Sequence, residues 1–187
     1  MFDRINFIKI INAHLSTLRS LNDKSNKIYW VDLVLFFIFP FIVSVLLVYY
    51  DISIKELIGE LIKSVAIFAA FLFNMLAIIY NSMNQIEQDA KQSKLKRVFI
   101  KEIHANLSFN ILIGIFLITT LLIYSELKSN SPILHLIYSS FAVINYFLLI
   151  LFILTLLMNL NRVFILLNRN IKDKTENESK TPHEPKA

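Results

Sequence analysis

Arg97 and His104 are the pair of residues in this sequence whose types and spacing could perform catalysis together. They lie seven positions apart in the stretch SKLKRVFIKEIHANLSFNILIGIFL, residues 93–117, so on a helix they share one face. A composite arginine and histidine site of this kind could cleave RNA. The same stretch also changes from lysine-rich to apolar without a break, as a helix does where it enters a membrane.

The residues around this pair favour the membrane interpretation. HEPN nucleases, which use this spacing, usually carry a polar residue after the arginine, and Val98 stands there instead. His104 is also next to the start of a predicted membrane span, which is a poor position for binding RNA. We therefore interpret Arg97 as a contact to lipid phosphate and His104 as a marker of the interface, and we predict no enzyme. A membrane-tethered RNase that uses both residues stays as an alternative.

No other pattern for catalysis or ligand binding is present in the sequence. It has no cysteine, two glycines, and four scattered histidines at positions 14, 104, 135 and 183. Zinc sites need a closely spaced set of Cys and His ligands, and phosphate-binding loops need several glycines. We therefore predict no catalytic residue, no metal and no cofactor.

The composition places the chain among membrane proteins. Its 187 residues are 56% hydrophobic and 18% charged, against about 45–50% and ~25% in soluble domains. Four stretches reach the ~20 apolar residues with which a helix crosses a bilayer. These four spans are residues 31–50, 61–80, 105–124 and 133–160. The predicted fold class is an all-α integral membrane protein, with a four-helix transmembrane domain at 31–168.

The positive charges predict the orientation of the spans. Of the lysines and arginines, 16 lie in the N-terminal segment, the linker 81–104 and the C-terminal segment, and 3 lie in the other two connections. Positive charge accumulates on the cytoplasmic side, so both termini and the linker should be cytoplasmic, in a bacterial inner membrane. Topology accounts for most of the net charge of +5, and direct nucleic-acid binding is not expected.

Three pieces of the chain would lie in the cytoplasm. Residues 1–29 predict an amphipathic helix, which lies on the inner leaflet or packs its apolar face on the other helices. The linker 81–104 predicts helical extensions of spans two and three, and the tail 169–187 predicts disorder. Five basic residues of the linker are candidates for docking a partner protein: Lys91, Lys94, Lys96, Arg97 and Lys101.

Two stripes of small and amide side chains predict how the spans pack. The stripe on span two comprises Ala66, Ala70, Asn74, Ala77 and Asn81. The stripe on span three comprises Asn106, Asn110 and Gly114. Small residues let helix backbones approach each other, and amides form hydrogen bonds across the contact. We predict that Asn74 faces Asn110, within one chain or across a contact of a homo-oligomer, with Ala70 and Gly114 in the same packing surface.

The centre of the chain resembles a known family. The residues that carry the resemblance are FLFNMLAIIYNSMNQ at the end of span two, the basic linker, and KEIHANLSFNILIGIFL at the start of span three. They are similar to the KwaA family, the four-span membrane subunits of the bacterial Kiwa anti-phage defence system, over roughly residues 65–120. The resemblance implies a sensor in the inner membrane that detects perturbation by phage and acts through a cytoplasmic, DNA-binding partner of the KwaB kind.

Three functions are open at this point. The first is a non-enzymatic sensor or scaffold that detects membrane perturbation and recruits or activates a cytoplasmic partner. The second is an oligomeric pore-forming or membrane-disrupting effector, in which the asparagine stripes line a lumen. The third is the membrane-tethered RNase. No charged residue lies deep in a span, which argues against a proton-coupled transporter or a voltage sensor.

Overall fold

The computed structural model describes residues 6–18, 30–86, 93–127 and 132–180, and in these ranges the regular structure is entirely helical. A continuous helical segment runs from Trp30 to Tyr49 and contains a π-helix. The elements are α1 (Phe7–Thr17), α2 (Trp30–Leu33), the π-helix (Val34–Ile38), α3 (Phe39–Tyr49), a short 3-10 helix (Lys55–Leu57), α4 (Ile58–Ile86), α5 (Ser93–Glu126) and α6 (Pro132–Lys180).

Within the described ranges, three helical segments are long and apolar enough to cross a membrane, and predicted spans two, three and four lie inside them. These segments are Lys55–Asn81, Arg97–Glu126 and Pro132–Ile165. The first predicted span corresponds to α2, the π-helix and α3, where the apolar helix Val34–Tyr49 is shorter than the other three. This architecture is compatible with the helical membrane protein that the composition predicts.

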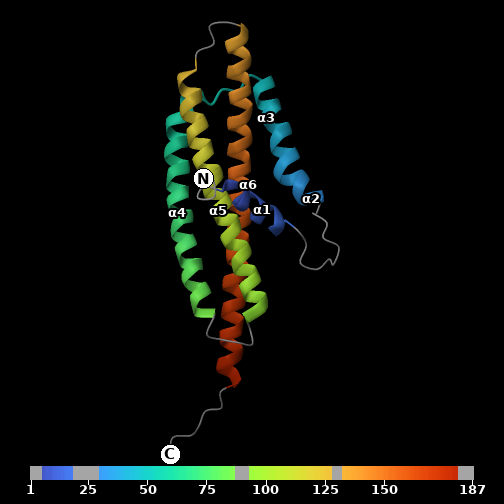
Figure 1. Cartoon of the computed structure of the whole chain (residues 1–187), viewed down its shortest axis with the longest axis vertical. Helices are drawn as coiled ribbons and strands as arrows, with labels where there is room; N and C mark the ends of the chain where they lie inside the picture. The colour runs from blue at the N-terminus through green and yellow to red at the C-terminus, as the bar shows by residue number, and fades with distance from the viewer. Residues whose placement is uncertain (1–5, 19–29, 87–92, 128–131, 181–187) are drawn as a thin grey trace, which may run out of the picture.

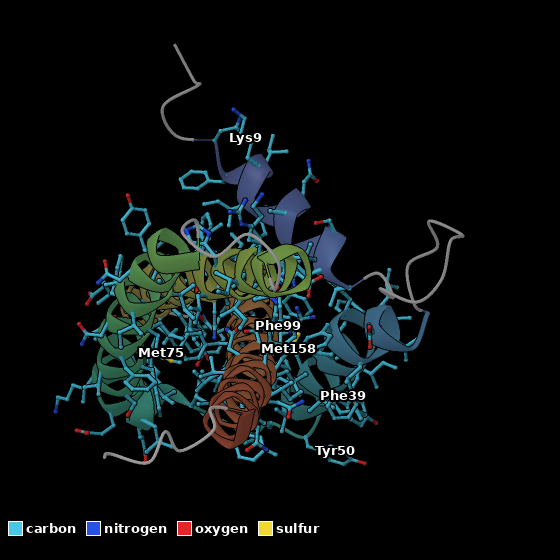
Figure 2. The ribbon with its side chains drawn as sticks, turned by 90° about the horizontal axis from the view of Figure 1, so that it is seen from below. Lys9, Phe39, Tyr50, Met75, Phe99 and Met158 are labelled. Atoms are coloured by element: carbon cyan, nitrogen blue, oxygen red, sulfur yellow. The ribbon has the colours of Figure 1, made fainter. Side chains whose placement is uncertain are left out.

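The helices form a bundle in which α5 and α6 are central. The helix α4 packs on α5, α5 packs on α6, and α6 packs on α3 (Figure 1). The short helix α1 lies against α5, outside the row of long helices (Figure 2). In Figure 1 the lower end of the bundle carries the end of α4 and the start of α5, and this end is called the lower end below; the start of α2 lies higher, near the level of α1.

A series of polar contacts, called the ladder below, joins α5 to α6. From the upper to the lower end, its four rungs are Thr120 with Asn145, Asn110 with Thr155, Asn106 with Asn159, and Glu102 with Arg162. The Thr155 hydroxyl donates to Asn110 Oδ1 at 2.9 Å, and Arg162 Nη1 lies 3.0 Å from Glu102 Oε2. The numbers rise along α6 as they fall along α5, so all four rungs fit one antiparallel register.

Pro40 provides a physical reason for the π-helix that precedes it. Proline has no backbone N–H, and in an α-helix its ring clashes with the carbonyl four residues earlier, which here belongs to Phe36. A wider π-helical turn at Val34–Ile38 relieves this conflict. The result is a local widening in the lower half of the first predicted span, facing α6.

The C-terminal tail differs from the sequence-based expectation. The sequence predicts disorder from residue 169, whereas α6 continues through Lys180. The segment 169–180 contains neither glycine nor proline, and it is rich in Lys, Glu and Asn, which a helix already formed upstream can continue. Pro182 is the first residue that would interrupt it, and residues 181–187 lie outside the described ranges.

At Gly114 of α5, side chains of α4 and α6 leave little room for a further side chain. A Cβ atom at this position would lie 3.2 Å from Cε2 of Phe152 on α6 and 3.6 Å from Cγ1 of Val65 on α4. The other glycine, Gly59, has nothing within 4 Å of a Cβ atom. A small residue is therefore required at Gly114 and is not required at Gly59.

Gly114→Leu should lower the stability of the bundle, because the added side chain has to displace Phe152 and Val65. We expect a loss of about 1–3 kcal/mol, which is typical for inserting atoms into a packed interior. Gly59→Leu is the matched control and should change stability by less than about 0.5 kcal/mol. Thermal unfolding of the purified protein in detergent, followed by circular dichroism, measures both variants. Equal losses in the two variants would contradict the packing argument.

Candidate functional site

The helix α1 docks on α5 through a face centred on polar residues. Asn6 caps its start by accepting a hydrogen bond from the backbone N–H of Lys9 at 3.2 Å. His14, Thr17 and Leu18 are buried against the bundle, whereas Ile8 and Ile11 remain exposed. Of the two placements predicted for this segment, α1 thus adopts packing on other helices, and its docked face combines part of the predicted apolar stripe, namely Ile10, Leu15 and Leu18, with the polar His14 and Thr17.

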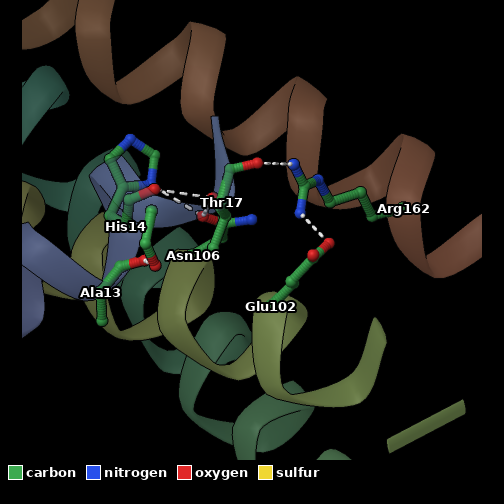
Figure 3. A network of polar contacts seen from close by, with 7 residues as sticks. Ala13, His14, Thr17, Glu102, Asn106 and Arg162 are labelled. Atoms are coloured by element: carbon green, nitrogen blue, oxygen red, sulfur yellow. Dashed lines mark hydrogen bonds and ion pairs between the residues drawn. The ribbon is translucent and has the colours of Figure 1, made fainter. Parts of the chain in front are cut away.

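His14 and Thr17 both contact Asn106 of α5 (Figure 3). The ring nitrogen Nδ1 of His14 lies 2.7 Å from Asn106 Oδ1, and since this oxygen only accepts, Nδ1 carries the proton. The Thr17 hydroxyl lies 2.7 Å from the same oxygen and 2.7 Å from the carbonyl oxygen of His14. The His14 ring is stacked on Phe109, with the ring centroids 3.9 Å apart.

Arg162 of α6 joins the end of α1 to the ladder. Its Nη2 donates to the carbonyl oxygen of Thr17 at 3.1 Å, while its Nη1 donates to Glu102 at 3.0 Å. The last carbonyls of a helix lack intrahelical partners and carry a partial negative charge, so a guanidinium there satisfies an acceptor and stabilises the helix dipole. His14, Thr17, Glu102, Asn106, Asn159 and Arg162 together are called the junction below.

The docked position requires that His14 be neutral. Burial of the side chain lowers the pKa of His14 from 6.5 to about 4; the hydrogen bond to Asn106 acts in the opposite direction, and the positive charge of Arg162 lowers the pKa further. Its ring is fully buried, so protonation would place a second positive charge near Arg162 without access to water. His14 is therefore neutral at pH 7 as long as α1 is docked.

The junction contains several buried polar atoms without hydrogen-bond partners. They are His14 Nε2, Asn106 Nδ2 and Asn159 Oδ1, and Asn110 Nδ2 higher in the ladder is a fourth. A buried polar atom without a partner costs about 1–3 kcal/mol. The contacts that hold α1 are thus opposed by unsatisfied groups in the same place.

The predicted packing residues divide between the interior and the surface. Asn110 and Gly114 lie in the interior, against Thr155 and Phe152 of α6. The stripe of span two lies on the outer side of α4, opposite the buried line Val65, Leu72 and Ile79. All five of its members are exposed: Ala66, Ala70, Asn74, Ala77 and Asn81.

The predicted pairing of Asn74 with Asn110 is wrong. Asn110 is fully buried, its Oδ1 accepts from Thr155, and its Nδ2 has no partner. Asn74 lies on the exposed side of α4, so it does not reach Asn110 within the chain, and burial of Asn110 excludes a contact with a second copy. The stripe on span three is thus used against α6, which is the neighbour that the sequence analysis did not consider.

The structure describes the side chains of only some of the predicted partner-docking residues. Arg97 and Lys101 are exposed on α5, and His104 is exposed on the same face one turn further along. Lys94 and Lys96 lie in α5, with side chains outside the described set, and Lys91 lies outside the described residues. Arg97 and His104 therefore share a surface, as their spacing predicts, and this surface faces away from the junction residue Glu102, which contacts α6.

The residues of the junction were largely missed by sequence reasoning. The N-terminal segment predicts an apolar docking face, which draws attention away from His14 and Thr17. A usable signal was present in α5 and α6, where Glu102 and Arg162 stand at the lower ends of two consecutive apolar stretches. Consecutive spans run antiparallel, so opposite charges at matching ends can form a pair.

Comparison with protein-family models, with curated proteins and with solved structures finds no match to this chain. Within the described residues, no group of three or more His, Cys, Asp or Glu side chains is arranged to hold a metal ion. The class that the structure itself defines is an all-helical protein with three long apolar helices and a shorter one, built around a buried polar junction.

Glu102→Gln should destabilise the protein, because it leaves the largely buried Arg162 without its counter-charge. The two side chains are 15% and 18% exposed, so we expect a loss of about 1–3 kcal/mol. Glu60→Gln is the matched control, since Glu60 pairs with Lys63 at 72% and 69% exposure, and it should change stability by less than about 0.5 kcal/mol. Thermal unfolding in detergent compares the variants, and a loss in Glu60→Gln as large as that in Glu102→Gln would refute the assignment.

Acidification should release α1 from α5. Because the pKa of His14 is lowered to about 4 in the docked state, docking is most stable above pH 6.5 and weakens as pH falls from 6.5 towards 4. The loss reaches about 2 kcal/mol at pH 5, at 1.36 kcal/mol per unit. The variants Ser16→Cys and Lys101→Cys place spin labels at two exposed positions in a chain without other cysteines. Double electron–electron resonance spectroscopy then measures the distance between the labels on α1 and α5.

The matched control for this titration is His14→Gln in the same labelled background. Glutamine does not titrate, so the label distances should be the same at pH 7.5 and pH 5, whereas the chain with His14 should show a second, longer and broader population at pH 5. Identical pH dependence with and without His14 would assign the titration to another group, and the proposed role of His14 would then be wrong.

Proposed function

We propose that this chain is a non-enzymatic membrane sensor and scaffold, in which α1 carries a change in the bilayer to a cytoplasmic partner. The observation that carries the proposal is the docking of α1. This helix is held on the bundle by the junction, its Ile8 and Ile11 remain exposed at 68% and 38%, and unsatisfied atoms oppose its docking. The proposed switch requires that this helix can also leave its docked position.

The exposed isoleucines of α1 support contact with lipid. Ile8 and Ile11 remain exposed in the docked position, with Lys9 nearby, as in helices that bind at the level of the lipid headgroups. Three other apolar residues, Ile10, Leu15 and Leu18, pack on the bundle together with His14 and Thr17. A change in lipid packing or surface charge therefore acts on the same helix that the junction holds.

The proposed orientation follows the distribution of lysine and arginine. With both termini in the cytoplasm of a bacterium, the lower end of the bundle faces inward, and α1 and the junction lie near the inner surface of the cytoplasmic membrane. The exposed residues Arg97 and Lys101 then lie in the cytoplasm, where they offer a basic surface to a partner protein. The resemblance to KwaA supports anti-phage defence as the setting and a KwaB-like protein as that partner.

The two other functions have less support. In the pore hypothesis the asparagines line a lumen, but Asn106, Asn110, Asn145 and Asn159 are buried between helices of one chain. In the RNase hypothesis Arg97 and His104 act together, and their shared exposed face keeps this hypothesis open to test. A homo-oligomer remains a prediction. We would expect the exposed amides and alanines of α4 to form the surface between copies. The mass of the detergent-solubilised particle tests this prediction.

Protection against phage should depend on the docking of α1. Thr17→Val removes a hydroxyl of the junction at nearly constant volume, and we expect it to weaken docking by about 1 kcal/mol, or roughly fivefold in the docking equilibrium. Thr119→Val is the matched control, since the Thr119 hydroxyl is exposed and donates to the carbonyl of Ile115 in its own helix. The measurement is the efficiency of plating on a bacterial host that expresses the chain with its neighbouring genes.

We expect Thr17→Val to change protection, and we expect Thr119→Val and His104→Ala, which leaves the basic surface of Arg97 and Lys101 intact, to retain it. Loss of protection in His104→Ala, with RNA degradation in the native strain, would support the RNase instead. Depolarisation of cells that express the chain alone would support the pore. Full protection by Thr17→Val, in a protein shown by spin labels to have a released α1, would contradict the proposed switch.

A further inference from the structure

A groove beside the junction lies between the first predicted span and α6. It has a volume of about 370 Å³, within the range of 300–1,000 Å³ that is usual for small-ligand sites. Its walls come from α2 and the π-helix on one side and from α6 on the other, and the end of α1 closes it. The lining residues are Leu18, Asp32, Leu35, Phe36, Leu154, Leu157, Met158, Asn161 and Arg162.

The polarity of this groove changes along its length. On α6 the apolar Leu154, Leu157 and Met158 are followed toward the lower end by Asn161 and Arg162. The same order appears on the opposite, antiparallel wall, where Asp32 of α2 precedes Leu35 and Phe36 of the π-helix. The groove is therefore apolar towards the middle of the bundle and charged at its lower end. An occupant of this groove needs an apolar chain attached to a polar head.

The charged end of the groove carries one group of each sign. Asp32 is a carboxylate, and Arg162 is a guanidinium that is 18% exposed. The two hydrogen bonds from Arg162 to Thr17 and Glu102 use two of its five N–H donors. A headgroup that combines a phosphate with a primary ammonium group matches this pair, with the phosphate at Arg162 and the ammonium at Asp32. A headgroup with negative charge alone would be repelled by Asp32.

The π-helix is the second feature that supports a ligand here. Two of the lining residues, Leu35 and Phe36, belong to Val34–Ile38, and π-helical turns are frequently found at functional sites. An extended polypeptide segment is a poor occupant, because its backbone N–H and C=O groups would enter an apolar wall without partners. A hydrocarbon chain has no such groups, so it fits the wall formed by Leu154, Leu157 and Met158.

We propose that this groove binds one phospholipid with an ammonium–phosphate headgroup, of the phosphatidylethanolamine class, from the leaflet at the lower end of the bundle. Its acyl chain occupies the apolar wall, and Arg162 and Asp32 hold the two charges of the headgroup. This inference deepens the proposed function by naming the membrane component that is sensed. The assignment of the lower end of the bundle to the cytoplasmic leaflet rests on the proposed function. Lipid binding itself does not depend on that assignment, so it is tested separately.

Arg162 connects the lipid to α1. The same guanidinium that would bind the phosphate donates to the carbonyl of Thr17 at the end of α1 and to Glu102. A phosphate at this position competes for the orientation of the guanidinium, and Leu18, next to Thr17, is part of the groove wall. Occupancy of the groove and docking of α1 are therefore coupled, and by reciprocity release of α1 changes the affinity for the lipid.

The test is native mass spectrometry of the full chain, purified in detergent and freed of lipid, with phosphatidylethanolamine and phosphatidylglycerol of identical acyl chains. We expect phosphatidylethanolamine to bind at least about fivefold more tightly, a difference of roughly 1 kcal/mol. Asp32→Asn should bring the ratio of the two affinities close to one. Equal binding of the two lipids by the native chain would overturn the headgroup assignment.

A second pair of variants tests the apolar wall without touching the junction. Leu157→Trp fills the groove and should weaken phosphatidylethanolamine binding about tenfold, whereas Leu160→Trp, at an exposed leucine outside the groove, should leave it unchanged. Equal binding by both variants would overturn the assignment of the acyl chain. Millimolar inorganic phosphate should not displace the lipid; if it does, the site binds free anions and the proposal is wrong.

These measurements are made without phage, partner or cells. Failure of lipid binding would therefore leave the proposed sensor function standing with a different signal, and failure of the plating assay would leave the lipid site standing. Circular dichroism of each variant before the titration shows that the helical content is that of the native chain, so that loss of binding is not loss of the fold.

Discussion

The ladder between α5 and α6 fixes the positions of the other elements. Lipid tails are as apolar as leucine side chains, so apolar surface alone gives helices in a bilayer little reason to associate in one register. Hydrogen bonds across the seam provide that reason, because Asn106, Asn110 and Asn145 are fully buried and their amides need partners there. Each such bond contributes only about 0.6 kcal/mol on average, but sliding α5 along α6 by one turn would break all four rungs together. The ladder therefore determines the register more than it determines the total stability.

The lower two rungs differ from the upper two, because they are shared with a third element. At the upper rung, both the oxygen and the nitrogen of the Asn145 amide have partners. At the level of Asn106, the amide oxygen is used by two residues of α1, and the amide nitrogen has no partner. Arg162 likewise divides its donors between α5 and α1. The same groups that set the register of α5 and α6 thus receive α1, and they do so with part of their hydrogen-bonding capacity unsatisfied.

The long helices could be predicted from the sequence, and the neighbours of each polar stripe could not. Runs of apolar residues are set by the thickness of a bilayer, so spans 61–80, 105–124 and 133–160 correspond to segments of α4, α5 and α6 that are long enough to cross it. The stripe of Asn106, Asn110 and Gly114 was recognised as a packing surface, but assigned to the helix before it instead of the helix after it. Both neighbours of α5 are antiparallel to it, so periodicity alone does not choose between them. Matching polar residues at equal depth in α6, namely Asn145, Thr155 and Asn159, would have decided for α6. The junction was harder to predict, since the docking of α1 depends on one buried histidine whose burial no local pattern indicates.

Arginine is the residue that can connect a membrane surface to a helix end at this position. Its guanidinium is planar, keeps its charge at any physiological pH and presents five donors in fixed directions, so one side chain can bind a carboxylate and a helix carbonyl together. A lysine carries its three N–H donors on one nitrogen atom, so it would reach acceptors on two different helices less well. In the proposed function, a lipid phosphate becomes another acceptor for the Arg162 guanidinium. Whether α1 stays docked then depends on how the N–H donors of Arg162 are divided among Glu102, Thr17 and the lipid. A change of headgroup near Arg162 then alters the hold on α1 without moving the long helices, because the register of α5 and α6 is retained by the upper rungs of the ladder.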